Sequence, residues 1–398
     1  MSSSRLKFEP FFSWVNRGRI LFTPGARNEL AFELTQLGAS RPLVITDKGV
    51  VNAGVTDMVL CELLKSGMKV AGLFDSVLQD ARIENINEAG QFYREVMADS
   101  LIAIGGGSVL DTAKAVNILV GKKLEDFKPL ADQAALWENA ELLPPHVAIP
   151  TTAGTGCEVT NAVVVLDSES QAKLSVSHPY CNADLALLDP ELTVKLPPKI
   201  TASTGMDALT HAIEGITSTA SQPISDALGL HVLRLIAEAL PIAVSEPDNI
   251  EARGDMLIAA TMAGMCFCNA MTGATHALAH SLGALYSVPH GLANAIMLPV
   301  VMEYNLEEAI EKYSMIAQVL GVTAGRSFSK VKAEAAVIAV RKLKEKIGLH
   351  ETLKDFQVPN TPDELSALVE LAAGDSQISY NPRTPDESDI LNMYLKAI

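Results

Sequence analysis

The chain has 398 residues, of which 48% are hydrophobic and 20% charged, a composition typical of a soluble globular protein large enough for two domains. Its net charge of −16 argues against a nucleic-acid-binding or anionic-membrane surface, since both need clustered Lys and Arg. The cysteines are few and odd in number, which suits reduced thiols in a cytosolic protein. Residues 1–12 contain no apolar run followed by a small-residue cleavage site, so we expect no secretory signal and a cytoplasmic location.

The first half of the chain alternates short apolar runs with helical patterns. A helix is expected over residues 55–66, ending before Gly67. An added strand pair is expected at 163–166 and 174–177. Buried strands are expected at residues 42–46, 69–74, 100–104, 146–150 and 185–188. This rhythm of strands and helices predicts a mainly parallel sheet with helices on its faces.

The character of the sequence changes at Pro197-Pro198. Beyond this double proline, a natural boundary, strand-like runs give way to Ala- and Leu-rich helical segments. We therefore predict an α/β domain at residues 1–196 and an all-helical domain at 197–398. Residues 256–302 contain no Asp, Glu, Lys or Arg. Because polar residues interrupt this stretch, we expect helices buried in protein and not a membrane span.

Two polar glycine loops follow predicted strands. The Gly105-Gly106-Gly107-Ser108 turn precedes a helix, whose free N–H groups and dipole can hold a phosphate. It is neither the GxGxxG fingerprint nor the P-loop, and tight turns also use glycine. The loop after the next strand adds three hydroxyls, from Thr151, Thr152 and Thr155. Because ligands bind at the carboxyl ends of parallel strands, the two loops together predict a dinucleotide site.

Asp47 comes at the end of the first predicted strand. A carboxylate there can hydrogen-bond a ribose diol and repel a 2′-phosphate, which favours NAD over NADP. Aspartate at this kind of position also caps helix N-termini. From the residues alone, both interpretations stay open.

The second half concentrates potential metal ligands. Asp207 and His211 lie four residues apart, so on a helix they share one face. His276 and His280 repeat that spacing, and His290 follows in a Pro-His-Gly loop. Buried imidazoles need partners, either hydrogen bonds or an ion, and the stretch around these three has no ionised side chain of its own. A carboxylate with imidazoles suits Fe(II), Zn(II) or a similar ion with an open position for substrate. The spacing does not choose among these metals.

Four motifs, in chain order, resemble those of the iron-containing (group III) alcohol dehydrogenases: GGGSVLDTAK, PTTAGTGCEVT, GMDALTHAIEG and HALAHSLGALYSVPHG. The resemblance covers nearly the whole chain. It implies an α/β N-terminal dinucleotide-binding domain plus an all-α C-terminal domain, the dehydroquinate synthase-like architecture, with the active site in the cleft between them. It also implies NAD, a divalent metal with Fe(II) ahead of Zn(II), and a homodimer or larger homo-oligomer.

The resemblance assigns roles to individual residues. The metal ligands are one carboxylate and three imidazoles: Asp207, His211, His276 and His290. Asp47 takes the ribose-binding position, which favours NAD. The full set of expected cofactor-binding residues is Asp47, Gly105, Gly106, Gly107, Ser108, Thr151, Thr152, Thr155 and Lys173.

Three further residues are expected near the reacting groups. His280 matches a histidine that lies near the nicotinamide and is proposed to relay protons, so the resemblance makes it catalytic. Phe267 matches an aromatic residue that lines the substrate pocket in relatives. Gln377 stands near the substrate, where some relatives have Cys. Phe267 and Gln377 together predict a small pocket with one polar wall, suited to a short, polar-substituted aldehyde.

Two other departures from the family pattern concern the cofactor half. Cys157 stands where many members have Ser or Ala. The usual Asn-Pro-Thr after the second strand is replaced by Asp80-Ala81-Arg82.

The sequence therefore predicts a metal-dependent oxidoreductase that interconverts a small primary alcohol and its aldehyde with NAD(H). In this reading the metal acts as a Lewis acid and hydride passes to the nicotinamide. Two alternatives remain open: a hydroxyacid–oxoacid transhydrogenase that keeps its NAD bound, and a non-catalytic scaffold protein on the same fold.

Overall fold

The computed structural model describes residues 11–131, 143–169, 172–178, 180–322 and 327–398. Most of the N-terminal stretch in which we expect no secretory signal lies outside these residues. The chain divides into two compact units, a sheet unit and a helical unit. The sheet unit comprises residues 16–197 and 246–264. The helical unit comprises the described residues up to Val15, together with 198–245 and 265–398.

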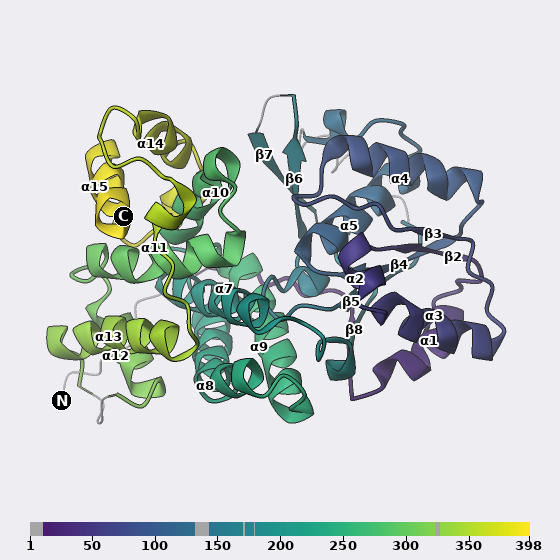
Figure 1. Ribbon diagram of the computed structural model, residues 1–398, viewed down its shortest axis with the longest axis horizontal. Coiled ribbons are helices and arrows are strands. Elements are labelled where there is room, and N and C mark those ends of the chain that lie inside the picture. Colours follow the sequence, from purple (N-terminus) through teal and green to yellow (C-terminus); the bar gives the residue numbers. More distant parts are fainter. Residues whose placement is uncertain (1–10, 132–142, 170–171, 179, 323–326) are drawn as a thin grey trace. The chain divides into compact units, whose positions relative to one another are not determined.

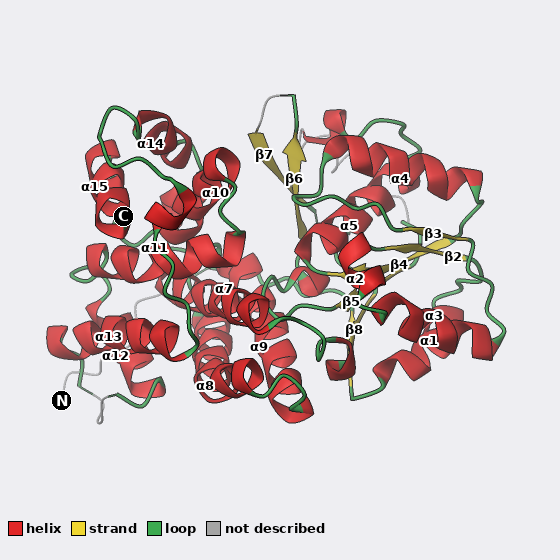
Figure 2. Cartoon of the chain, viewed as in Figure 1, coloured by secondary structure: helices red, strands yellow, loops and turns green. Residues whose placement is uncertain are grey.

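A six-stranded sheet forms the centre of the sheet unit, and all of its neighbouring strands pair in parallel. The strand order is β1-β8-β5-β4-β2-β3, and strands β2, β3, β4, β5 and β8 are labelled in Figures 1 and 2. The strands are β1 (Arg19–Phe22), β2 (Pro42–Ile45), β3 (Gly72–Phe74), β4 (Ser100–Gly105), β5 (His146–Pro150) and β8 (Leu185–Leu188). The predicted parallel α/β architecture is confirmed.

Helices cover both faces of this sheet, because successive side chains of a strand point to opposite faces. Val44 and Ile102 pack in one core with residues of α1 and α3, whereas Leu43 and Leu101 pack in the other with residues of α4 and α5. The described helices of this unit are α1 (Leu30–Gln36), α2 (Lys48–Asn52), α3 (Val55–Ser66), α4 (Ile83–Glu95), α5 (Gly107–Gly121) and α9 (Ile250–Ala270) as far as Gly264.

A separate two-stranded sheet and one edge strand complete the strands described in this unit. The predicted strand pair is present as the antiparallel strands β6 (Ala162–Asp167) and β7 (Ala172–Ser177). Strand β1 was not predicted. It lies at one edge of the sheet, and three of its four residues are exposed, so it lacks the apolar run that marks the buried strands.

The helical unit contains no strand among the residues that the structure describes, as predicted for this half of the chain. Its helices are α7 (Pro198–Thr217), α8 (Pro223–Ser245), the end of α9 (Ile250–Ala270), α10 (Ala274–Tyr286), α11 (His290–Tyr304), α12 (Ile310–Val319), α13 (Lys330–Lys346), α14 (Ser366–Ala373) and α15 (Glu387–Ala397). Helices α7 and α8 approach closely: a Cβ on Gly205 would lie 2.3 Å from Leu240. Short 3₁₀ helices lie at Ala26–Glu29, Lys128–Ala131, Cys157–Val159, Pro190–Leu192, Leu353–Phe356 and Ser376–Tyr380.

One described helix, α8, is long and apolar enough to cross a bilayer, and 39% of its most apolar window is buried. Helices α9 and α10 meet the same criterion only as a pair bent by 106°. Apolar core helices of soluble proteins have the same length and composition, so these helices are weak evidence for a membrane span.

Candidate metal centre and dinucleotide loops

Three helices of the helical unit bring the predicted metal ligands together. Asp207 and His211 lie on α7, His276 lies on α10, and His290 begins α11. One ligand atom from each of Asp207, His276 and His290 lies within 4.8 Å of the other two. His211 is not part of that trio, but its ring stacks on His276 with centroids 4.5 Å apart and an interplanar angle of 24°.

The environment of these side chains sets their charges. Asp207, His211 and His276 are buried, while the side chain of His290 is 33% exposed. Burial lowers the pKa of His276 well below its ordinary value, so this imidazole is neutral and keeps a lone pair. Burial alone would raise the pKa of Asp207, but the neighbouring His211 and His290 outweigh it and lower this pKa. An ionised carboxylate among imidazoles is the donor set that Fe(II) and Zn(II) accept, so the residues fit a divalent cation.

Glu214 orients one of the imidazoles, and sequence analysis did not single it out. Its Oε2 lies 2.5 Å from Nδ1 of His276, and its Oε1 accepts the backbone N–H of Thr275 at 2.6 Å. This contact leaves Nε2 of His276 for the side where Asp207 lies, 3.8 Å away. A carboxylate behind a histidine ligand is a common orienting arrangement in metal sites. Its spacing offered a signal: Asp207, His211 and Glu214 lie at i, i+4 and i+7 on one face of α7.

His280 is held by a second carboxylate that sequence analysis did not identify. Its Nδ1 lies 2.7 Å from Oδ2 of Asp375, which precedes a 3₁₀ turn far along the chain. The His280 ring stacks on His290, with centroids 5.4 Å apart, and its side chain is 23% exposed. The Asp375 contact therefore fixes the ring of His280 beside the ligand cluster. Nothing in the local sequence marks Asp375, because it lies 95 residues from His280.

The two predicted substrate residues lie in the helical unit as well. The ring of Phe267 stacks on His211, with centroids 4.2 Å apart and an interplanar angle of 17°. Gln377 follows Asp375, which accepts its backbone N–H at 2.8 Å. Its side-chain oxygen accepts the hydroxyl of Thr272 at 2.9 Å. Phe267 thus touches the metal cluster directly, whereas Gln377 is linked to it through Asp375 and His280.

The two glycine and threonine loops of the sheet unit lie side by side. Gly105 is paired with Pro150 at the ends of β4 and β5, and its carbonyl accepts the backbone N–H of Thr151 at 3.0 Å. A Cβ on Gly106 would lie 3.3 Å from the hydroxyl of Thr152. A Cβ on Gly107, the first residue of α5, would lie 2.8 Å from Thr155. The neighbouring loop therefore leaves little room for a side chain at Gly106 or Gly107, and the start of α5 offers backbone N–H groups of the kind that bind anions.

A close contact between two glycines holds the threonine loop against helix α9. Gly156 has φ +63°, and a Cβ on it would lie 2.6 Å from the Cα of Gly264 in α9. Gly264 in turn contacts the backbone of Gly156, since a Cβ on it would lie 2.6 Å from the Gly156 carbonyl oxygen. Both residues belong to the sheet unit. The loop is thus packed backbone to backbone on a helix.

The Asp80-Ala81-Arg82 loop, which departs from the family pattern, contacts two of the predicted cofactor-binding residues, Ser108 and Lys173. The backbone N–H of Asp80 donates to Oγ of Ser108 at 3.1 Å, and the Asp80 carboxylate pairs with Nζ of Lys173 at 3.0 Å. Asp80 and Ala81 both have positive φ, +70° and +44°, which is uncommon for residues other than glycine. Asp80 thus links Lys173 to the glycine loop.

Asp47 caps the N-terminus of a helix, one of the two roles that its sequence position predicted. It is the N-cap of α2, and its Oδ1 accepts the backbone N–H of Val50 at 2.9 Å. The cap engages one oxygen of a partly exposed carboxylate, so capping does not exclude a second contact through the other oxygen.

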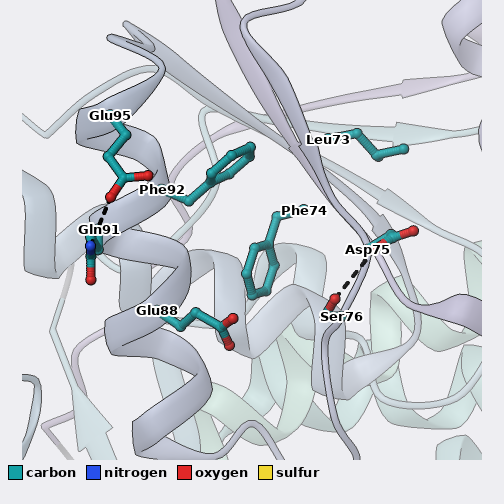
Figure 3. A pocket seen from close by; sticks show the side chains of 8 residues that line it. All are labelled: Leu73, Phe74, Asp75, Ser76, Glu88, Gln91, Phe92 and Glu95. Carbon is teal, nitrogen blue, oxygen red and sulfur yellow. Dashed lines mark hydrogen bonds between the residues drawn. The ribbon is translucent and has the colours of Figure 1, made fainter.

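A surface pocket of the sheet unit contains none of the predicted site residues. It lies beside β3 and α4 (Figure 3), and it is lined by Leu73, Phe74, Asp75, Ser76, Glu88, Gln91, Phe92 and Glu95. This pocket therefore does not belong to the candidate site.

Known proteins similar to this chain fall into one family. Residues 17–190 match the family model described as iron-containing alcohol dehydrogenase, and residues 201–398 match the C-terminal model of the Fe-containing alcohol dehydrogenase family. A choline dehydrogenase from Bacillus subtilis (strain 168) is 37% identical over 371 residues, covering 91% of this chain and 89% of the relative. An NAD-dependent methanol dehydrogenase from Bacillus methanolicus is 32% identical over 378 residues, covering 94% and 96%.

A solved structure gives the same result for the fold. The crystal structure of a 1,3-propanediol oxidoreductase superposes with a TM-score of 0.91 at 33% identity, covering 98% of this chain and 100% of that one. The family uses NAD(H) and iron. The chain therefore belongs to the iron-containing alcohol dehydrogenases, a family of metal-dependent oxidoreductases that act on alcohols and aldehydes.

Proposed function

We propose that this chain is a soluble, cytoplasmic enzyme that interconverts a small primary alcohol and its aldehyde with NAD(H), and that it works as a homodimer or larger homo-oligomer. In this proposal residues 1–196 bind NAD and residues 197–398 bind the metal. The observation that carries the proposal is the convergence of Asp207, His276 and His290 within 4.8 Å. These side chains belong to motifs that the family shares, and their donor atoms suit a divalent cation.

The proposed metal ligands are Asp207, His211, His276 and His290. A divalent cation held there supplies a Lewis acid for the alcohol or carbonyl oxygen, and NAD(H) supplies the hydride acceptor or donor. The task of the protein is to orient the two reacting carbons and to exclude water. Glu214 supports this role because it fixes the ring of His276.

The proposed NAD site uses the adjacent loops of the sheet unit. Backbone N–H groups at Gly105, Gly106, Gly107 and Ser108 hold the pyrophosphate, and Thr151, Thr152 and Thr155 line the cofactor. Lys173 and Asp47 bind its ribose groups. The contact between the glycine turn and the threonines supports a shared ligand, and the Asp80 contact supports a fixed position for the Lys173 ammonium.

His280 is proposed to transfer the proton that the reaction releases or takes up. Its Nδ1 is occupied by Asp375, so Nε2 is the atom through which a proton exchanges. Phe267 is proposed as the apolar wall of the substrate pocket and Gln377 as its polar wall. The choline, methanol and 1,3-propanediol enzymes among the relatives act on small alcohols by name, which supports a short substrate, either unsubstituted or carrying a polar group.

Replacement of His211 tests the fourth ligand. His211→Ala should lose bound metal and activity while the chain stays folded, because a cation loses one of its donors. Metal content is measured by elemental analysis, and folding by circular dichroism. His231→Ala, at an exposed position of α8, is the matched control and should keep both. A His211→Ala protein with full metal content and rate would remove His211 from the ligand set.

Replacement of His280 tests the proton-transfer role. His280→Ala should keep its metal but lose kcat by roughly 10²–10⁴-fold, the usual contribution of a positioned acid or base. Steady-state rates with free NADH and an aldehyde, alongside metal analysis, measure both effects. Loss of metal would make His280 a ligand, and an unchanged rate would make it a packing residue. Sustained turnover of free NADH by the wild-type enzyme also separates a dehydrogenase from a transhydrogenase.

Replacement of Asp47 tests the cofactor preference. Asp47→Asn keeps a residue that caps helices as well as Asp but removes the charge that would repel a 2′-phosphate. The ratio of kcat/KM for NAD over NADP should therefore fall about tenfold or more, the equivalent of about 1.4 kcal/mol. Thermal unfolding checks that the α2 cap is intact. If the wild-type enzyme uses both cofactors equally, Asp47 does not contact the ribose.

A further inference from the structure

A single amide nitrogen touches every member of the metal-ligand trio. Asn294 lies on α11, one helical turn after His290, and is fully buried. Its Nδ2 donates to Oδ1 of Asp207 at 2.7 Å and lies 3.2 Å from Nε2 of His276. The same nitrogen lies 3.3 Å from Nε2 of His290. These are the three residues whose ligand atoms cluster.

The chemistry of the amide determines how it can be oriented. Its nitrogen carries two hydrogens and its oxygen carries none, so the nitrogen is the end that faces the ionised Asp207 carboxylate. Its second hydrogen is left for one imidazole nitrogen, such as Nε2 of His276, whose Nδ1 contacts Glu214. The hydrogen bond to the ionised carboxylate is the strongest of these contacts. Because the nitrogen faces the ligands, the side-chain carbonyl oxygen of Asn294 is buried without a hydrogen-bond partner among the described residues. Such an oxygen is costly to bury, so the contacts on the nitrogen side must stabilise this arrangement.

We infer that Asn294 is a positioning residue of the metal centre: its amide holds the Asp207 carboxylate in the orientation in which it meets His276 and His290. The inference rests on the proposed metal ligands. Asp207 lies on α7 and the two histidines lie on α10 and α11, so the three donors have no common backbone to align them. The Asn294 amide, fixed by burial on α11, hydrogen-bonds Asp207 and lies within 3.3 Å of Nε2 of both histidines. Pre-alignment of this kind raises metal affinity because less conformational freedom is lost on binding.

The test measures affinity for Zn(II) by competition with a coloured chelator, using metal-stripped full-length protein. Asn294→Leu fills the space of the amide without a donor, and Asn294→Ala removes the donor without adding bulk. Both should weaken Zn(II) binding by about 10–100-fold, as is usual when an orienting partner of a ligand is lost. The Co(II) absorption spectrum should change as the carboxylate loses its orientation, while NAD binding stays as in the wild type.

The matched control is Thr210→Val, which removes a buried hydroxyl that donates to Met206 O on the ligand-bearing helix α7. It should bind Zn(II) as the wild type does, so that loss of a buried polar group alone is separated from loss of the Asn294 donor. Unchanged or tighter binding by both Asn294 variants would overturn the inference and leave the metal centre intact. A wild-type chain that binds no Zn(II) would instead overturn the metal centre itself, and the inference with it.

Discussion

The burial of the Asp207 carboxylate is the constraint on which the helical unit depends. An ionised carboxylate out of water costs several kcal/mol unless it is paired, and around Asp207 stand Asn294, His276 and His290 from two further helices. The ring of His276 needs a hydrogen-bond partner of its own to keep its orientation, and Glu214 supplies that partner. A divalent cation would pair with this ionised carboxylate and accept the lone pair of the neutral His276, so the residues fit a charge that the chain does not supply.

The sheet unit depends on a different constraint, the close approach of backbones. Gly106 and Gly107 are needed because Thr152 and Thr155 lie against them, and Gly156 because α9 lies behind it. These contacts place the start of α5 beside the threonine loop, the arrangement that the proposed NAD site uses. In the proposed function the helical unit would hold the metal through side chains, while the sheet unit would hold the cofactor phosphates through backbone N–H groups.

The sequence predicts those parts of the fold and the site that follow from local pattern. Strands β5 and β8 were predicted with their observed ends because they are apolar and buried on both faces, whereas the exposed edge strand β1 has no such pattern. Helices α7 and α10 were predicted from the i, i+4 spacing of their ligands, whereas His290 was expected in a loop and instead begins α11. Asp375 was missed because its contact joins residues 95 positions apart. Asn294 was missed although it lies four residues after His290, because His290 was expected in a loop and so gave no helical spacing to follow. The positive φ of Asp80 and Ala81 was missed because neither is glycine.

X-ray absorption at the metal edge of the Zn(II)-loaded wild-type chain tests the central claim most directly, because it reports the donor atoms around the ion. The account predicts a shell of nitrogen and oxygen donors at about 2.0–2.2 Å, the range for imidazole and carboxylate ligands of zinc. Outer-shell scattering characteristic of imidazole rings should accompany it. A sulfur shell at about 2.3 Å would mean that the ion binds cysteine, and would contradict a centre built on Asp207 and the histidines.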